Sequence, residues 1–256
     1  MKYPEFQQII DTMEANGYGY KKEVAEIERR RIGIEEGTLD IPLSEHVKAM
    51  IFSLLSDQRV WSDIELHKNE LDVIFENYDI EKLKNKAPEA LVKEITDIKC
   101  GNRKIRKQMN DLKHNIEQLE RIERDHGSID KYYRSPNKVE IVKSLSEGTY
   151  KLKWMQVALV CEYLKGVGVN TIKPDSLLKR LLARLGYVQD KEEASPWEAI
   201  EICQEIADEY GMSMPMVDTI LWQYCAKDKF EVCTDKPECA QCGVHNCPSR
   251  TCPSLV

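Results

Sequence analysis

The chain has 256 residues, of which 42% are hydrophobic and 32% are charged, and its formal net charge is −7. This length suits one large domain or two small ones, and the acidic balance argues against a general binder of polyanions. The sequence contains no apolar run of membrane-spanning length and no signal-peptide pattern after Met1. We therefore expect no membrane partner and a cytoplasmic location.

Helical periodicity runs through almost the whole sequence, and no segment has the pattern of a strand. In chain order, the expected helices begin at Ser44, at a Ser62–Glu65 capping box, at Pro88, at Ile105, at Ser135, at Trp154, at Asp175, at a Ser195–Glu198 capping box and at Ser213. The helix from Ser62 is expected to reach Phe75, and the apolar stripe from Ile105 to stop before Gly127. The predicted fold class is all-α.

Four cysteines lie within fifteen residues near the C-terminal end, spaced Cys233-x5-Cys239-x2-Cys242-x4-Cys247, and Cys252 follows. Structural zinc usually takes two Cys-x2-Cys pairs, and only one such pair is present here. The spacing therefore favours a 4Fe-4S cluster, with zinc and disulfides as the alternatives. The remaining cysteines suit a reducing compartment, because they fall at apolar helix positions or helix ends: Cys100, Cys161, Cys203 and Cys225.

This cysteine loop and the segment in front of it, from Ile220 to Cys242, resemble the C-terminal cluster loop of the endonuclease III-like DNA glycosylases, the helix-hairpin-helix family. The resemblance implies that Cys233, Cys239, Cys242 and Cys247 hold a 4Fe-4S cluster, with Cys252 as the alternative to Cys247. It also implies a six-helix barrel at 41–168 and a cluster domain made from 1–40 and 169–256. The implied partner is double-stranded DNA with a damaged or modified base, bound by a monomer in the nucleoid.

The segment Ile172-Lys-Pro-Asp175-Ser-Leu-Leu-Lys-Arg180 is similar to the family's Val/Pro-Asp-x-x-x-x-Arg. The resemblance makes Asp175 the catalytic carboxylate, which stabilises the cationic transition state of C1′–N cleavage and orients the attacking water. The start of a helix favours the ionised form of this side chain. The alternative is an ordinary aspartate N-cap.

The segment from Leu145 to Trp154 resembles the family's DNA-binding hairpin, although it lacks the proline and one glycine. Gly148 and Lys151 would then contact DNA, and Lys153 lies near the position of the family's Schiff-base lysine. Lys153 is equally a candidate phosphate contact or a solvated side chain, so we expect a monofunctional enzyme. Trp154 falls on an apolar face, and we expect it to pack in the core.

Two further segments match the family in the same order. Gln58 follows Leu-Leu-Ser-Asp and would fill the space left by an extruded base, while Asn102 and Arg103 follow Gly101 in a second DNA-contacting segment. Lys236 is the basic residue kept between the first two cysteines of the loop. The expected function is a base-excision DNA glycosylase. The alternatives are a catalytically silent DNA- or partner-binding protein, a bifunctional lyase that uses Lys153, and an unrelated helical zinc protein.

Overall fold

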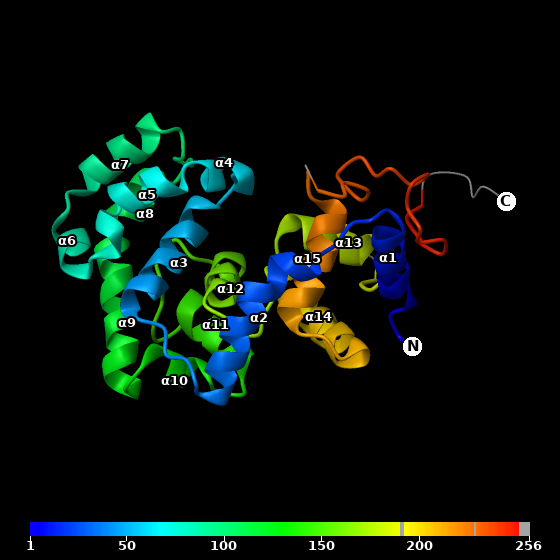
Figure 1. Ribbon diagram of the computed structural model, residues 1–256, viewed down its shortest axis with the longest axis horizontal. Coiled ribbons are helices and arrows are strands. Elements are labelled where there is room, and N and C mark those ends of the chain that lie inside the picture. The colour runs from blue at the N-terminus through cyan, green and yellow to red at the C-terminus, as the bar shows by residue number, and fades with distance from the viewer. Residues whose placement is uncertain (190–191, 228, 251–256) are drawn as a thin grey trace. The chain divides into compact units, whose positions relative to one another are not determined.

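The structure is a computed structural model that describes residues 1–189, 192–227 and 229–250 (Figure 1). Within these ranges the regular secondary structure is entirely helical, which confirms the all-α prediction. In the same ranges, no helix has both the length and the apolar character needed to cross a membrane.

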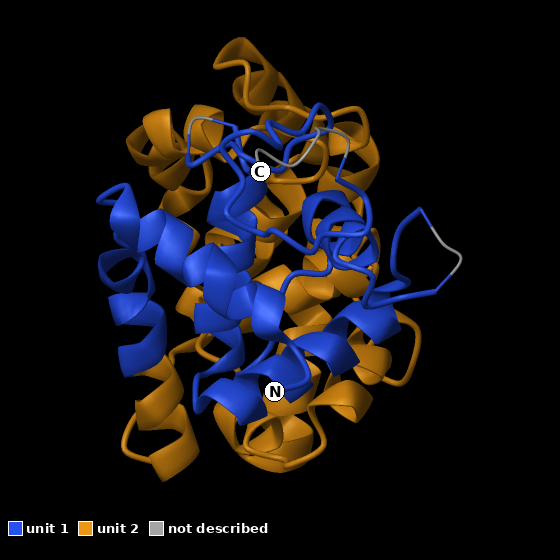
Figure 2. Cartoon of the chain, turned by 90° about the vertical axis from the view of Figure 1, so that its right-hand side faces the viewer, with its two compact units in different colours: residues 1–29, 170–256 blue, residues 30–169 orange. Residues whose placement is uncertain are grey.

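The chain divides into two compact units (Figure 2). Unit 1 combines residues 1–29 with 170–256, and unit 2 comprises residues 30–169. Residues 30–40, which the sequence analysis placed with the chain ends, pack in unit 2. There the Arg134 guanidinium donates to the Ile34 carbonyl over 2.9 Å, and the Ile34 side chain is buried.

Unit 2 is built around α3 (Leu43–Leu55), an apolar helix that packs on α12 (Val157–Gly166) and α9 (Leu112–His126). The other elements of this unit are the C-terminal part of α2 (Lys21–Glu36), α4 (Trp61–Leu66), α5 (Lys68–Ile74), η1 (Glu76–Tyr78), α6 (Ile80–Asn85), α7 (Pro88–Asp97), α8 (Ile105–Asn110), α10 (Ile129–Tyr133) and α11 (Lys138–Ser146). The face of α3 that forms the core carries Val47, Met50, Ile51, Leu54 and Leu55, all with no exposed surface.

Unit 1 is built around α15 (Met214–Cys225), which packs on α1 (Pro4–Ala15), α13 (Ser176–Arg184) and α14 (Pro196–Tyr210). The described chain after α15 contains no further helix, and this irregular segment carries the cysteine motif. A segment without helix or sheet buries little apolar surface of its own and must be tied down by other contacts.

Helix starts that depend on a local capping side chain are predicted correctly in unit 1. Asp175, Ser195 and Ser213 cap α13, α14 and α15, and Ser195 forms the full capping box with Glu198. In unit 2, α3 begins directly after Pro42 rather than at Ser44, and α4 begins at Trp61, so the Ser62–Glu65 capping box does not form.

Two predicted long helices are each split in the structure. The helix expected from Ser62 to Phe75 breaks at His67, and the stripe from Ile105 to Gly127 breaks at Asp111. Apolar spacing continues across both breaks, which is why periodicity alone predicts one helix in each case. At Asp111 the side chain accepts hydrogen bonds from the hairpin between α11 and α12, a tertiary contact that the pattern does not encode.

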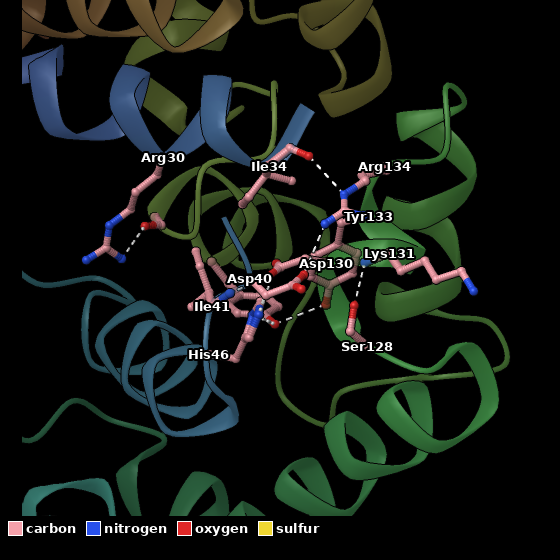
Figure 3. A network of polar contacts seen from close by, with 12 residues as sticks. Arg30, Ile34, Asp40, Ile41, His46, Ser128, Asp130, Lys131, Tyr133 and Arg134 are labelled. Carbon is pink, nitrogen blue, oxygen red and sulfur yellow. Dashed lines mark hydrogen bonds and ion pairs between the residues drawn. The ribbon is translucent and has the colours of Figure 1, made fainter. Parts of the chain in front are cut away.

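A buried polar network joins three helices of unit 2 (Figure 3). His46 of α3 pairs with Asp130 of α10 at 3.2 Å, and its Nδ1 lies 3.0 Å from the Tyr163 hydroxyl of α12. Tyr163 also bonds to Tyr133 over 3.0 Å, while Asp130 accepts a hydrogen bond from the Ile41 amide. Because these side chains are almost wholly buried, the network fixes how the helices pack rather than contacting solvent.

Candidate functional site

The four cysteines of the motif line one small cavity in unit 1, hereafter the cysteine cavity. Cys233, Cys239, Cys242 and Cys247 share its wall with Arg184, Val232, Pro237, Val244, Ser249 and Arg250. Val232 and Val244 are buried, and sulfur supplies the only potential metal ligands among the side chains of this lining. The structure thus brings all four sequence-predicted ligands together. Cys252, the alternative fourth ligand, lies outside the described residues.

Backbone hydrogen bonds hold the cysteine loop against α15 and against itself. The amides of Val232 and Cys233 both donate to the Tyr224 carbonyl, over 2.9 and 3.1 Å. The Arg250 guanidinium donates to the carbonyls of Cys239 at 3.0 Å and Val244 at 2.9 Å, and so closes the loop. These contacts set the path of the loop around the cavity.

Hydrogen-bond donors reach the sulfur atoms of two of the four cysteines. The Tyr224 hydroxyl donates to Cys242 Sγ over 3.1 Å, and Arg184 Nη1 lies 3.5 Å from Cys233 Sγ. Hydrogen bonds from the Cys225 thiol and then from Arg184 lower the pKa of Cys233 to about 6, against the opposing effect of burial. Burial raises the pKa of Cys247, whose thiol donates to the Arg184 carbonyl.

Arginine side chains with buried, unpaired nitrogens accompany the sulfur atoms. Nε and Nη2 of Arg180 and Nε of Arg250 have no hydrogen-bond partner in the part of the chain that the structure describes. Arg250 lines the cysteine cavity, and the charge of Arg180 acts on Cys233, where it lowers the pKa. Unpaired buried cations are costly unless an anion accompanies them. A thiolate-bound metal group, which carries net negative charge, meets this requirement.

The residues therefore fit a 4Fe-4S cluster by their chemistry: four sulfurs around one cavity, hydrogen-bond donors to two of them and arginine charge nearby. The same donor set also suits zinc, which stays an alternative. Within the described ranges, no group of three or more His, Cys, Asp or Glu side chains is arranged to hold a metal ion. The four cysteines share the cavity without forming such a group.

Asp175 lies at the N-terminus of α13 and is partly exposed. Its Oδ1 accepts hydrogen bonds from the amides of Leu177 and Leu178, over 3.0 and 3.1 Å. The N-cap interpretation of Asp175 is thus correct, and its catalytic role stays a prediction. Helix α13 then continues to Arg184, which contacts Cys233 and donates to the carbonyls of Thr234 and Asp235. One short helix therefore connects the candidate carboxylate to the cysteine cavity.

Lys153 lies in the hairpin of residues 147–156 between α11 and α12, in unit 2. Its Nζ forms an ion pair with Asp111 at 2.7 Å, and its backbone exchanges two hydrogen bonds with the buried amide side chain of Asn115. The pKa of Asp111 is lowered, because hydrogen bonds from Lys153 and Trp154 outweigh the opposing effect of burial. An ion-paired ammonium is a poor nucleophile, which favours the monofunctional interpretation.

Trp154 is not a core residue, so that prediction is wrong. Its side chain is 37% exposed, and its backbone has the left-handed φ of 65°. The indole Nε1 donates to Asp111 over 2.8 Å, and the Lys107 ammonium lies 5.2 Å from the ring centroid. The flanking Leu152 and Met155 are buried in its place.

Gln58 and the segment around Asn102 lie on neighbouring loops of unit 2. Gln58 is exposed just after α3 and has a left-handed φ of 57°. Arg59 donates to the carbonyl of Lys99, and Lys104 pairs with Asp57 at 2.9 Å, so the two loops are held together. Arg103 is exposed at this junction.

Asn102 is engaged inside unit 2 rather than exposed. Its Nδ2 donates to the Leu54 carbonyl over 2.9 Å and to the Gln108 side chain over 3.0 Å, while its Oδ1 accepts from the Lys104 amide. Its side chain therefore positions the loop and the end of α3. The role of Asn102 as a DNA contact stays a prediction.

The remaining predicted DNA contacts, Gly148, Lys151 and Lys236, are exposed. Gly148 closes the C-terminus of α11, and a Cβ atom there would lie 2.9 Å from the backbone of Ser144, so the position requires glycine. Lys236 lies on the cysteine loop of unit 1 beside Asp235 and Glu238, which are also exposed. The loop is thus mixed in charge.

The sequence analysis missed three residues that shape these sites: Tyr224, Arg250 and Asp111. Tyr224 and Arg250 lie in or beside the cysteine motif, but their contacts depend on how the loop folds back. Asp111 leaves no distinct sequence signal, because it lies between the stripe positions Met109 and Leu112 in a segment that contains other charged residues. Its part in the helix break and in anchoring the hairpin is visible only in the structure.

No protein-family model, curated protein or solved structure matches the chain. The resemblance to the helix-hairpin-helix glycosylases therefore rests on the sequence motifs alone.

Proposed function

We propose that the protein is a monofunctional DNA glycosylase that extrudes a damaged or modified base from double-stranded DNA and hydrolyses its N-glycosidic bond. The observation that carries the proposal is the construction of unit 1, where α13 has Asp175 at its start and Arg184 in contact with Cys233 at its end. A carboxylate and a cysteine-lined cavity joined by one helix match the order and the roles that the family resemblance implies.

The 4Fe-4S cluster has a structural role in this proposal. Cys233, Cys239, Cys242 and Cys247 would each bind one iron, and when bound the cluster supplies the metal–thiolate bonds that fold the irregular C-terminal segment. Arg184 and the Tyr224 hydroxyl hold two of these sulfurs in place. The clamped loop in turn fixes the last turn of α13, and so supports the helix that Asp175 begins.

Asp175 supplies the negative charge that C1′–N cleavage requires. As the base departs, positive charge develops on the sugar, and a carboxylate beside it stabilises the transition state and orients water for attack. Two backbone amides hold Oδ1 of Asp175 and so fix the position of the carboxylate at the helix end. The ion pair of Lys153 with Asp111 leaves hydrolysis by water as the expected route.

The test is single-turnover base release from a panel of lesion-containing duplexes by wild type and Asp175→Asn. Asparagine caps a helix about as well as aspartate, so the variant keeps the fold. Base release should fall by about 10²- to 10⁴-fold, the usual contribution of a positioned acid or base. Asp79→Asn is the matched control, because Asp79 caps α6 in the same way in unit 2 and should change nothing.

Base release by Asp175→Asn at the wild-type rate would remove the catalytic role of Asp175. Binding of lesion duplexes without release from any of them would instead favour the catalytically silent DNA-binding protein. Borohydride trapping in the same assay addresses the lyase alternative: we expect no covalent adduct, and an adduct abolished by Lys153→Ala would show a bifunctional enzyme.

A further inference from the structure

Trp154 combines a left-handed backbone with a partly exposed indole. Left-handed backbone is unfavourable for a residue with a side chain, and exposure of an indole forgoes the burial for which tryptophan is suited. The hairpin has its own apolar anchors, because Leu152 and Met155 are 0% and 2% exposed. The loop would therefore stay attached without an aromatic residue at position 154.

The surrounding polar contacts hold the indole in place at the surface. Asp111 accepts from Nε1 of the indole and from Nζ of Lys153, over 2.8 and 2.7 Å. The buried Asn115 side chain fixes the backbone of Lys153 from the opposite end of the same turn. A side chain that is exposed yet fixed loses little conformational entropy when it binds a partner, as in a preformed recognition surface.

A cation accompanies the ring. The ammonium of Lys107, on α8, lies 5.2 Å from the ring centroid, while Arg103 and Arg106 beside it are exposed. An aromatic ring next to positive charge is the arrangement with which proteins bind nucleic-acid strands, because bases stack on the ring and phosphates pair with the cations. Two acidic side chains of these loops are paired, Asp111 with Lys153 and Asp57 with Lys104.

Two other left-handed residues of unit 2 belong to the loops joined to this surface. Gln58 and Lys99 have φ values of 57° and 58°, and Arg59 and Lys104 tie their loops together. Helix α8 then leads from Lys104 to Lys107 and the indole. Backbone strain of this kind concentrates at binding sites, where the surrounding structure maintains it.

We propose that Trp154 is a stacking platform for a nucleobase of bound DNA, and that Lys107 takes the adjacent phosphate. The base is one unstacked by distortion of the duplex, because the faces of paired and stacked bases are inaccessible to a side chain. This inference rests on the proposed function only for its partner, DNA, and does not require that the protein cleave anything.

The experiment measures tryptophan fluorescence and binding affinity with a duplex that carries a tetrahydrofuran abasic site, and with the intact duplex. The abasic duplex should quench wild-type emission more than the intact one, and Trp154→Phe should remove that difference. Trp154→Ala should bind the abasic duplex about ten- to a hundredfold more weakly, and Trp154→Phe at most about threefold, because a phenyl ring still stacks. Lys107→Gln should lower the salt dependence of binding by about one phosphate contact.

Trp222→Phe is the matched control, because Trp222 also has a lysine ammonium near its ring, that of Lys229 at 5.8 Å, but lies in unit 1. It should leave the difference in quenching between the two duplexes unchanged. Equal affinity of wild type and Trp154→Ala for the abasic duplex would overturn the platform, as would a wild-type protein that binds neither duplex.

The two proposals fail in distinguishable ways. Quenching that depends on Trp154, together with no base release from any lesion duplex, removes the glycosylase and keeps the platform. Base release combined with unchanged binding by Trp154→Ala removes only the platform. A circular-dichroism melt of each variant shows whether it is folded. If Trp154→Ala is unfolded, the quenching measured with Trp154→Phe still tests the platform.

Discussion

The buried polar groups of unit 2 form a network of neutral and acidic side chains, whereas those of unit 1 include arginine nitrogens near a cavity lined by four cysteines. In unit 2, Asp130 lies 3.2 Å from His46 Nε2, and His46 Nδ1 lies 3.0 Å from the Tyr163 hydroxyl. In unit 1, Arg180 has two buried nitrogens without a hydrogen-bond partner among the described residues. On the proposed account, an anionic cluster would offset the arginine charge of unit 1, and unit 2 would need no added group.

The two units also differ in the regularity of the segments that form their cores. In unit 2, α3 packs mainly on the helices α12 and α9, whereas about the last quarter of unit 1 follows an irregular path after α15. Removal of a metal ligand should therefore damage only unit 1, and removal of a buried charge in the network should damage only unit 2.

The largest expected effect is that of Cys239→Ser, which removes a buried cysteine that we propose as a cluster ligand. The purified protein should be colourless and largely insoluble, or proteolysed in the C-terminal segment, because metal–thiolate bonds supply the folding energy of that segment. Cys203→Ala is the control: Cys203 is fully buried in the same unit but does not line the cavity, so this protein should keep its iron. A brown, stable Cys239→Ser protein would contradict the ligand assignment.

A smaller loss is expected from Asp130→Asn, which replaces the carboxylate that contacts His46 and accepts the Ile41 amide in the core of unit 2. A buried polar group left without its hydrogen-bond partner costs about 1–3 kcal/mol of folding free energy. Urea denaturation followed by hydrogen exchange should show the loss in residues 30–169, with the iron content unchanged. In the control, Asp40→Asn removes an ion pair with Arg134 whose carboxylate is 67% exposed, and should cost at most about 1 kcal/mol. Loss of iron from Asp130→Asn would break the proposed independence of the units.

The smallest effect concerns the hairpin of unit 2 at low pH. Hydrogen bonds from Lys153 and Trp154 lower the pKa of Asp111, so its contribution to stability is fully present above the unfolded value of about 3.9. The contribution is lost as the pH falls through the lower, folded value, when the protonated carboxyl releases Lys153. The difference in emission between wild type and Trp154→Phe should change in this acidic range. A change centred well above about pH 5 would exclude Asp111 as its source.

Local sequence signals predicted much of unit 1. The caps at Asp175, Ser195 and Ser213 are formed by side chains two or three residues from the amides they accept, so short sequence windows contain all the information. The spacing of the four cysteines was enough to predict that they lie together, as they do around one cavity. The hydrogen bond from Tyr224 to Cys242 could not be predicted in this way, because it depends on the path of the loop.

Unit 2 was predicted less well, because tertiary contacts decide its boundaries. The break at Asp111 and the exposed position of Trp154 are two sides of one contact between segments 43 positions apart. An apolar pattern assigns both residues to continuous helices, because periodicity gives no information about a hydrogen bond between an indole and a carboxylate far away in the sequence. Residues 30–40 were misplaced for the same reason, as Arg134 holds them in unit 2.

The most direct test of the account is the iron, sulfide and zinc content of wild-type protein purified without oxygen. We predict about four irons and four acid-labile sulfides per chain, the composition of one 4Fe-4S cluster held by four cysteines. One zinc per chain without sulfide would contradict the cluster, and with it the main support for a glycosylase.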